Sequence, residues 1–185
     1  MRKTYLFMMV SLDGFFEGPD HDISWHNVDE EFDRFAIEQL NETDTILFGR
    51  KTYAMMASFW PSDTAKEADP ETAERMNTTP KVVFSRTLEK ADWQNTTLVR
   101  DGLKEAVEDR KRQSGKDIAV FGSSDLSVSL LQMGLLDELR IMVNPVVLGD
   151  GKRLFEGIRG RLALTLVNTR TFANGNVLLY YQPKA

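Results

Sequence analysis

The sequence predicts a three-layer α/β domain over residues 1–185, with a mostly parallel central sheet and an antiparallel C-terminal hairpin. The first observation is that short apolar runs alternate with segments whose apolar residues recur at helical spacing. The second is a pair of alternating runs, 162–171 and 176–181, joined through Asn174-Gly175, which is a strong hairpin signal. Together they favour strand–helix–strand units that end in a hairpin.

Composition limits the classes of function. Apolar residues make up 42% of the chain and charged residues 28%, as in ordinary globular proteins. No apolar run reaches the length of about 18 residues that a membrane span needs, and no apolar signal segment follows Met1-Arg2-Lys3, so we expect a cytoplasmic protein. The absence of cysteine excludes thiolate catalysis, and two histidines leave little material for a metal site, so none is expected. The net charge of −5 argues against nucleic acid as a partner.

The first element is an apolar run over residues 4–12, which predicts a central strand covered on both faces. It ends at Asp13, which either forms a tight turn with Gly14 or points at a ligand from the end of the strand. Residues 13–27 read as a loop long enough to have a function. Its aromatic side chains, Phe15 and Trp25 among them, either stack on a planar heterocycle or anchor the loop to the core.

The next element is a helix that begins at Asn27, the expected N-cap, and packs on the sheet through an apolar face. On spacing alone Glu30 is a capping-box residue of this helix. The strand 45–48 then ends at a turn that opens another helix: Gly49-Arg50-Lys51-Thr52. A glycine, two cations and a hydroxyl at a helix start suit a phosphate group, although a capped helix with solvated cations has the same pattern. The segment 54–79 is the least regular, and the polar composition of 62–79 predicts a surface excursion beside the pocket, with a helix start at Pro70.

The later elements repeat this pattern. The strand 81–84 ends at Ser85-Arg86-Thr87, where Arg86 is either solvated or a phosphate ligand. A helix is expected over 102–113, and a strand then stops at Gly122-Ser123-Ser124. Free amides at the following helix start favour an anion, unless Ser124 caps them. Gly134 ends that helix, and alternating residues from Leu139 to Val143 predict the next strand.

A resemblance to a known family rests on a long run in the second half of the chain. It reads Leu130-Leu131-x-x-Gly134-Leu-x-Asp137-Glu138-Leu-Arg140, followed by Asn144-Pro145-Val146-Val147-Leu148-Gly149-x-Gly151. This run resembles the C-terminal reductase domain of bifunctional riboflavin-biosynthesis deaminase–reductases, which has the dihydrofolate reductase fold and uses NADPH. Ser11-Leu12-Asp13-Gly14 matches the same family, and Gly49-Arg50-x-Thr52 is similar to dihydrofolate reductase itself.

The resemblance implies an NADPH-dependent reductase of a small heterocyclic or ribosylamino-pyrimidine substrate, like the 5-amino-6-(5-phosphoribosylamino)uracil reductases of riboflavin biosynthesis, and a homodimer. It implies that Asp13 and Glu30 are the candidate acids and that Phe15 and Trp25 lie beside the substrate. The implied NADPH ligands lie in three turns and the residues that flank them: Gly49, Arg50, Lys51, Thr52, Ser85, Arg86, Thr87, Phe121, Gly122, Ser123, Ser124 and Leu126.

One departure from the family concerns the substrate. The riboflavin reductases hold the ribose phosphate with an Asp-Asn-Pro-x-Leu-x-x-Arg segment, whereas the corresponding residues 53–61 here lack both the Asn-Pro pair and the arginine. The alternatives are therefore a dihydrofolate or pteridine reductase and, from another class, a nucleotide-binding module without turnover.

Overall fold

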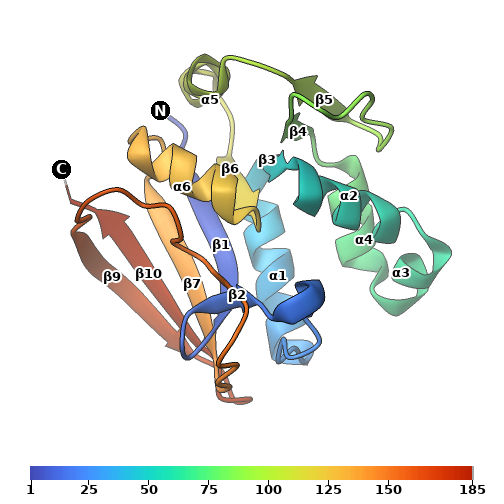
Figure 1. Cartoon of the computed structure of the whole chain (residues 1–185). Coiled ribbons are helices and arrows are strands. Elements are labelled where there is room, and N and C mark those ends of the chain that lie inside the picture. Colours follow the sequence, from blue (N-terminus) through green and yellow to red (C-terminus); the bar gives the residue numbers. More distant parts are fainter. Residues whose placement is uncertain (185) are drawn as a thin grey trace.

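A computed structural model describes residues 1–184 and builds the chain around one large sheet (Figure 1). Its strands are β1 (Thr4–Ser11), β3 (Thr43–Gly49), β4 (Lys81–Phe84), β5 (Thr96–Val99), β6 (Asp117–Phe121), β7 (Glu138–Asn144), β9 (Leu164–Thr171) and β10 (Val177–Pro183). In space they follow the order β5-β4-β3-β6-β1-β7-β10-β9. The strands from β5 to β7 run parallel, and β10 is antiparallel to both of its neighbours. The predicted sheet with its C-terminal hairpin is confirmed.

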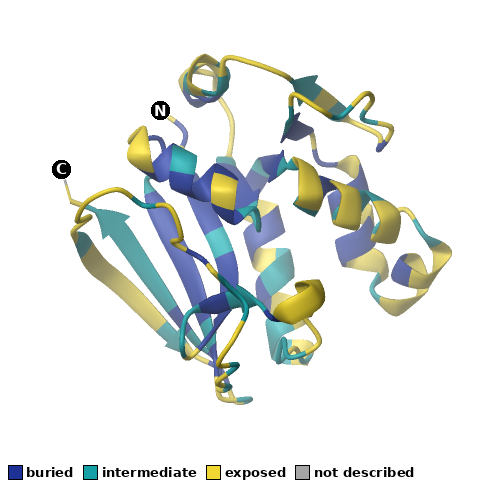
Figure 2. Cartoon of the chain, in the orientation of Figure 1, coloured by how far each residue is buried: buried dark blue, intermediate teal, exposed yellow. Residues whose placement is uncertain are grey.

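Helices cover both faces of the sheet, which gives the three predicted layers. On one face lie α1 (Glu30–Glu42), α2 (Arg50–Phe59) and α4 (Pro70–Thr78), and on the other α5 (Leu103–Arg112) and α6 (Ser124–Gln132). Alternation along β1 explains the division, because Leu6 and Met8 pack with α6 whereas Met9 packs with α1. Figure 2 shows that β1 and β7 are mostly buried, while the edge strand β9 is largely exposed.

The segment 54–79 is more regular than the sequence indicated. After α2 it forms α3 (Asp63–Ala68) and α4, whose first turns are capped by the side chains of Ser62 and Asp69. The segment 62–79 lies at the surface, as predicted, but it is helical and buries one face, with small and apolar side chains of both helices such as Ala65 and Met76. Few large apolar residues mark this buried face, so its helical period was weak in the sequence.

The connection between β1 and α1 also contains regular structure. Its β2 (Phe15–Glu17) pairs with β8 (Lys152–Arg153) and is followed by the short helix η1 (Pro19–His21). The predicted cap of α1 is wrong, because the Asp29 carboxylate accepts the amide of Phe32 at 2.9 Å. Asn27 binds the C-terminal hairpin instead. Its side-chain amide donates to the Asn174 carbonyl at 2.8 Å, and its own carbonyl accepts from the Asn176 side chain at 2.7 Å.

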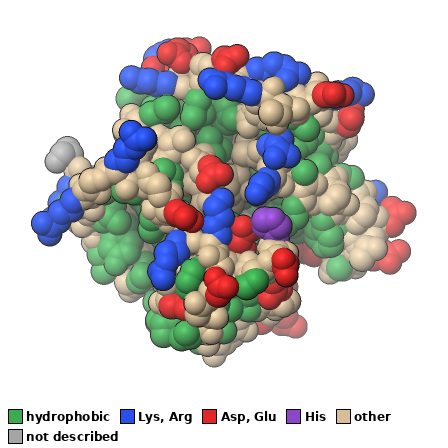
Figure 3. All heavy atoms as spheres, viewed as in Figure 1, with side chains coloured by type: hydrophobic (Ala, Val, Ile, Leu, Met, Phe, Trp, Pro, Cys, Tyr) green, Lys and Arg blue, Asp and Glu red, His purple; other side chains and the backbone are tan. Residues whose placement is uncertain are grey.

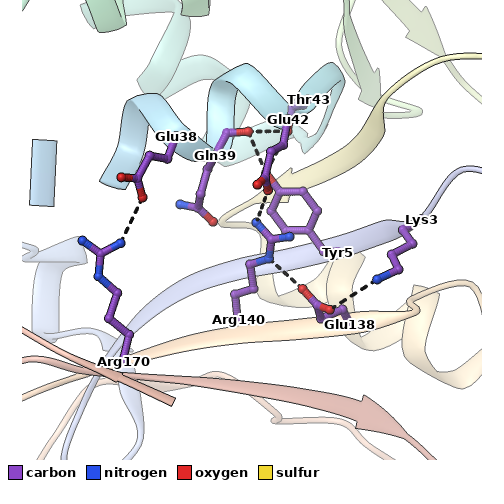
Figure 4. A network of polar contacts seen from close by, with 9 residues as sticks. All are labelled: Lys3, Tyr5, Glu38, Gln39, Glu42, Thr43, Glu138, Arg140 and Arg170. Atoms are coloured by element: carbon purple, nitrogen blue, oxygen red, sulfur yellow. Dashed lines mark hydrogen bonds and ion pairs between the residues drawn. The ribbon is translucent and has the colours of Figure 1, made fainter. Parts of the chain in front are cut away.

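An ion cluster fills the space between α1 and the sheet (Figure 4). The Arg140 side chain donates to Glu138 at 2.8 Å, lies 3.4 Å from Glu42, and stacks 3.8 Å above the centre of the Tyr5 ring. Arg140 alternates with Leu139 and Ile141 along β7, which lies between β1 and β10 and is covered on both sides. The guanidinium is therefore buried and satisfied by carboxylates and an aromatic face.

Among residues 1–184, no helix combines the length and apolar character that crossing a bilayer requires. The same residues include no group of three or more His, Cys, Asp or Glu side chains placed to hold a metal ion.

Candidate functional site

Three turns that follow neighbouring strands share one edge of the sheet. Because β4, β3 and β6 are adjacent and parallel, their carboxyl ends lie at the same edge, followed by residues 85–87, 49–52 and 122–124. Ligands of open α/β sheets bind at this kind of edge. The three turns therefore lie near one another, and their side-chain contacts determine which of them form the site.

Ser123 joins two of these turns. Its hydroxyl oxygen accepts the Gly49 amide at 2.8 Å and donates to the Thr52 hydroxyl, also at 2.8 Å. Ser123 adopts a left-handed backbone, with φ of 64°. At Gly122, with φ of 71°, an added Cβ would lie 2.9 Å from the Thr52 methyl carbon. The starts of α2 and α6 are thus in direct contact, and the close approach requires glycine at position 122.

The two helix starts in contact are suited to an anion. Within residues 1–184, no side chain caps the first turn of α2 or of α6. The amides of a first turn have no partner inside the helix and carry its positive dipole end. Arg50 and Lys51 add two exposed cations at the start of α2. This end of the site fits the phosphates of a nucleotide.

A cavity of about 710 Å³ extends from these helix starts into the space between α1, α2 and α4. Its volume is in the range of pockets for small ligands and cofactors. The walls of the cavity are mostly apolar. On the molecular surface, charged side chains of both signs lie near the centre of the face drawn in Figure 3. The lining includes Phe7, Phe16, His26, Phe32, Asp33, Gln39, Leu40, Met56, Trp60, Asp69, Thr72, Met76 and Phe121.

The predicted cofactor residues fall into two groups. Six of them line the cavity, and they come from the two joined turns: Arg50, Lys51, Thr52, Phe121, Gly122 and Ser123. Gly49 contacts Ser123, while Ser124 and Leu126 are buried behind the turn. The third turn does not line the cavity. There the Ser85 hydroxyl accepts the amides of Thr87 and Leu88, and Arg86 pairs with Asp101 at 2.9 Å.

Asp13 lies outside the cavity lining and fastens two loops together. Its carboxylate accepts the Ser11 hydroxyl at 2.7 Å and the amides of Leu148 and Gly149 at 3.1 and 2.8 Å. The Ser11 hydrogen bond first, and these two amides after it, lower the pKa of Asp13 to about 2. A carboxyl group with this pKa is ionised at neutral pH, so the geometry favours a structural role over that of a proton donor.

Glu30 also points away from the cavity. Its side chain is 96% exposed and lies 3.9 Å from Arg34. Asp33, one helical turn further along α1, lines the cavity instead. Partial burial first, and then the charge of Asp69, raise the pKa of Asp33 above its ordinary value. The resemblance predicted that the acid of α1 is Glu30, but one turn of the helix separates this residue from the carboxylate that lines the cavity.

The aromatic residues predicted to lie beside the substrate, Phe15 and Trp25, do not line the cavity, whereas the residues that follow them do. Phe15 is buried under the Arg153 guanidinium, and the Trp25 indole donates to the Asp22 carbonyl at 3.0 Å. Phe16 lines the cavity, because side chains alternate along β2, and His26 also lines it. Burial lowers the pKa of His26, which favours its neutral form.

Comparisons with known proteins agree with this fold. The uncharacterised protein YyaP of Bacillus subtilis (strain 168) is 37% identical over 180 residues, which covers 97% of this chain and 94% of YyaP. A putative riboflavin biosynthesis protein from Shewanella sp. PV-4 superposes with a TM-score of 0.76 at 21% identity, covering 99% of both chains.

A deaminase/5-amino-6-(5-phosphoribosylamino)uracil reductase from Thermotoga maritima superposes with a TM-score of 0.69 at 15% identity, covering 99% of this chain and 57% of that one. The family model described as RibD C-terminal domain matches residues 2–178. The chain therefore belongs to the RibD C-terminal domain family.

Proposed function

We propose that this protein is an NADPH-dependent reductase that transfers a hydride to a planar heterocycle held in the cavity. The observation that carries the proposal is the continuity of the cavity. It runs from two joined, uncapped helix starts to an apolar region that includes a carboxyl group with a raised pKa. A phosphorylated dinucleotide and a flat substrate need these two environments side by side.

Different residues of the cavity would bind the cofactor, exclude water and supply the proton. Arg50 and Lys51, with the first amides of α2 and α6, would hold the cofactor phosphates. NADPH supplies the hydride when bound. Phe16 and Phe121 would exclude water from the reacting rings, and Asp33 would hold the proton that the reduced substrate takes up. The raised pKa of Asp33 keeps more of its protonated form near neutral pH than an ordinary aspartate has.

The substrate is a pyrimidine or related heterocycle of the kind used in riboflavin biosynthesis. Support comes from membership of the RibD C-terminal domain family and from the reductase activity named for the Thermotoga maritima protein. The flat apolar walls around Phe32 and Trp60 suit such a ring.

The test measures NADPH and NADH binding by calorimetry and then the loss of reduced nicotinamide absorbance with pyrimidines and pteridines. We expect NADPH to bind more tightly than NADH and at least one heterocycle to be reduced. Asp33→Asn should lose hydride transfer and keep its NADPH affinity, whereas Glu30→Gln should keep both. Binding of NADPH without turnover of any substrate would identify a nucleotide-binding module, and absence of NADPH binding would refute the reductase.

A further inference from the structure

We infer that the ring of the substrate carries an apolar substituent, such as an aryl group, which lies at the mouth of the cavity between α2 and the connection before α1. The inference rests on the proposed function for the reduction of the ring. The place of the substituent can nevertheless be measured as binding, separately from turnover.

Four apolar residues of the cavity lining are open to solvent and are here termed the apolar mouth: Ile23, Val28, Ala54 and Met55. The first two belong to the connection before α1, and the last two lie on α2. Ile23 is 38% exposed, Val28 54% and Met55 46%. Because these residues line the cavity and are also exposed, a ligand in the cavity can cover the surface that they leave open. Large apolar side chains gathered at a pocket mark a place that binds an apolar group.

The last turn of α2 adds an aromatic residue to the lining beyond Met55. Trp60 lines the cavity, and its indole Nε1 donates to the Met56 sulfur Sδ at 3.1 Å. The Phe59 ring packs edge-on against Trp60, with ring centres 5.1 Å apart, and the Asn77 side chain donates to the Trp60 carbonyl at 2.9 Å. These contacts hold the indole without a ligand. An apolar group would therefore meet a preformed surface, and its binding would cost little side-chain freedom.

The same stretch of α2 does not suit a sugar phosphate. Residues 54–60 contribute apolar side chains to the lining, namely Ala54, Met55, Met56 and Trp60. This stretch falls within the segment that lacks the Asn-Pro pair and the arginine with which the riboflavin reductases hold the ribose phosphate. Of the cations near the mouth, Arg50 and Lys51 belong to the cofactor end, and His21 lies 3.1 Å from Glu17. A sugar phosphate between Val28 and Met55 would lose water without gaining hydrogen bonds from them, whereas an apolar group gains by leaving water.

The test compares three uracils by calorimetry on the full chain, with and without NADPH. 6-Aminouracil is the ring alone, 6-anilinouracil adds an aryl group, and 5-amino-6-(5-phosphoribosylamino)uracil adds a sugar phosphate. We expect 6-anilinouracil to bind at least about tenfold more tightly than either of the others, because its phenyl group and the apolar mouth cover one another. Tighter binding of the phosphorylated compound, equal binding of the anilino and amino compounds, or binding of none of the three overturns the inference. Failure of NADPH to bind strikes the reductase proposal alone, because the free protein still reports on the three uracils.

Two variants locate the aryl group, and a third is the matched control. Met55→Gln and Val28→Thr each replace an apolar side chain by a polar one of similar size, and each should weaken 6-anilinouracil about fivefold while 6-aminouracil stays within about twofold. Met133→Gln makes the same change as Met55→Gln at a 44% exposed position at the end of α6, outside the lining, and should change neither affinity.

Stability and mass measurements separate recognition from other roles of the apolar mouth. All three variants change exposed positions, so their unfolding midpoints should stay within about 2 °C of the wild type. An unchanged affinity for 6-anilinouracil in both Met55→Gln and Val28→Thr contradicts the inference. If light scattering then shows a lower mass for these two variants, the apolar mouth is a contact between chains instead of a substrate site.

Discussion

Removing the Ser123 hydroxyl should separate the two helix starts that it joins. Ser123→Ala deletes the acceptor of the Gly49 amide and the donor to Thr52, while the backbone at position 123 keeps its left-handed conformation. Each hydrogen bond contributes about 1 kcal/mol, so the free energy of unfolding should fall by about 2 kcal/mol. Ser123→Gly loses the same bonds but tolerates the positive φ, and should be about 1 kcal/mol more stable than the alanine variant.

Urea unfolding followed by tryptophan fluorescence measures these differences. Ser129→Ala is the matched control, because its hydroxyl bonds only to a carbonyl within α6, and its stability should lie within about 0.5 kcal/mol of the wild type. NADPH affinity should weaken about tenfold in both Ser123 variants, since both lack the hydroxyl. An alanine variant as stable as the wild type, or a glycine variant less stable than the alanine variant, would refute the reasoning.

Three further outcomes test other parts of the structure. Arg140→Met should lower the free energy of unfolding by about 3 kcal/mol, because the buried Glu138 then keeps only Lys3, at 3.9 Å. Adding Glu138→Leu should recover part of the loss, and no recovery in urea titrations would contradict this. Burial raises the pKa of Tyr5 to about 12 from 10.0, so the unfolded chain ionises first. The stability of the wild type relative to Tyr5→Phe should therefore fall as the pH rises from 10 to 12, and a constant difference in pH-dependent unfolding would argue against it. Light scattering should give twice the mass of one chain for the proposed homodimer, and Val167→Lys on the exposed edge strand β9 should give a monomer; a monomeric wild type excludes the dimer.

The elements predicted from the sequence are those whose signals are local. The apolar run of β1 and the hairpin at Asn174-Gly175 needed no tertiary information, and Gly134 ends α6 with φ of 67°. Lys81 shows the opposite case. It begins a strand but is 1% exposed, and its ammonium donates to the carbonyls of Met76, Asn77 and Thr79 at the end of α4. Such a contact depends on where α4 packs.

The two ends of the site differ in the same way: one is marked by a local sequence signal and the other depends on tertiary packing. The joined turns at Gly49 and Ser123 could be predicted from the sequence, because the residues that suit a phosphate at a helix start are adjacent in the chain. The part of the cavity between α1 and α4 could not, because Asp33 and Thr72 come from helices distant in sequence. A period of 3.6 residues also allows either Glu30 or a residue one turn later to face the ligand.

The connection that carries Phe16 and His26 is held at one end by Asp13 and at the other by Asn27, and both anchors use backbone groups from the final part of the chain. During synthesis the wall of the cavity therefore emerges early, but its anchor at Asn27 is complete only when Asn174 and Asn176 of the hairpin are present. A chain shortened before Asn174 would retain the strands from β1 to β7 in its sequence, yet it should bind ligand poorly. Ligand binding at the cavity thus depends on the presence of the β9–β10 hairpin.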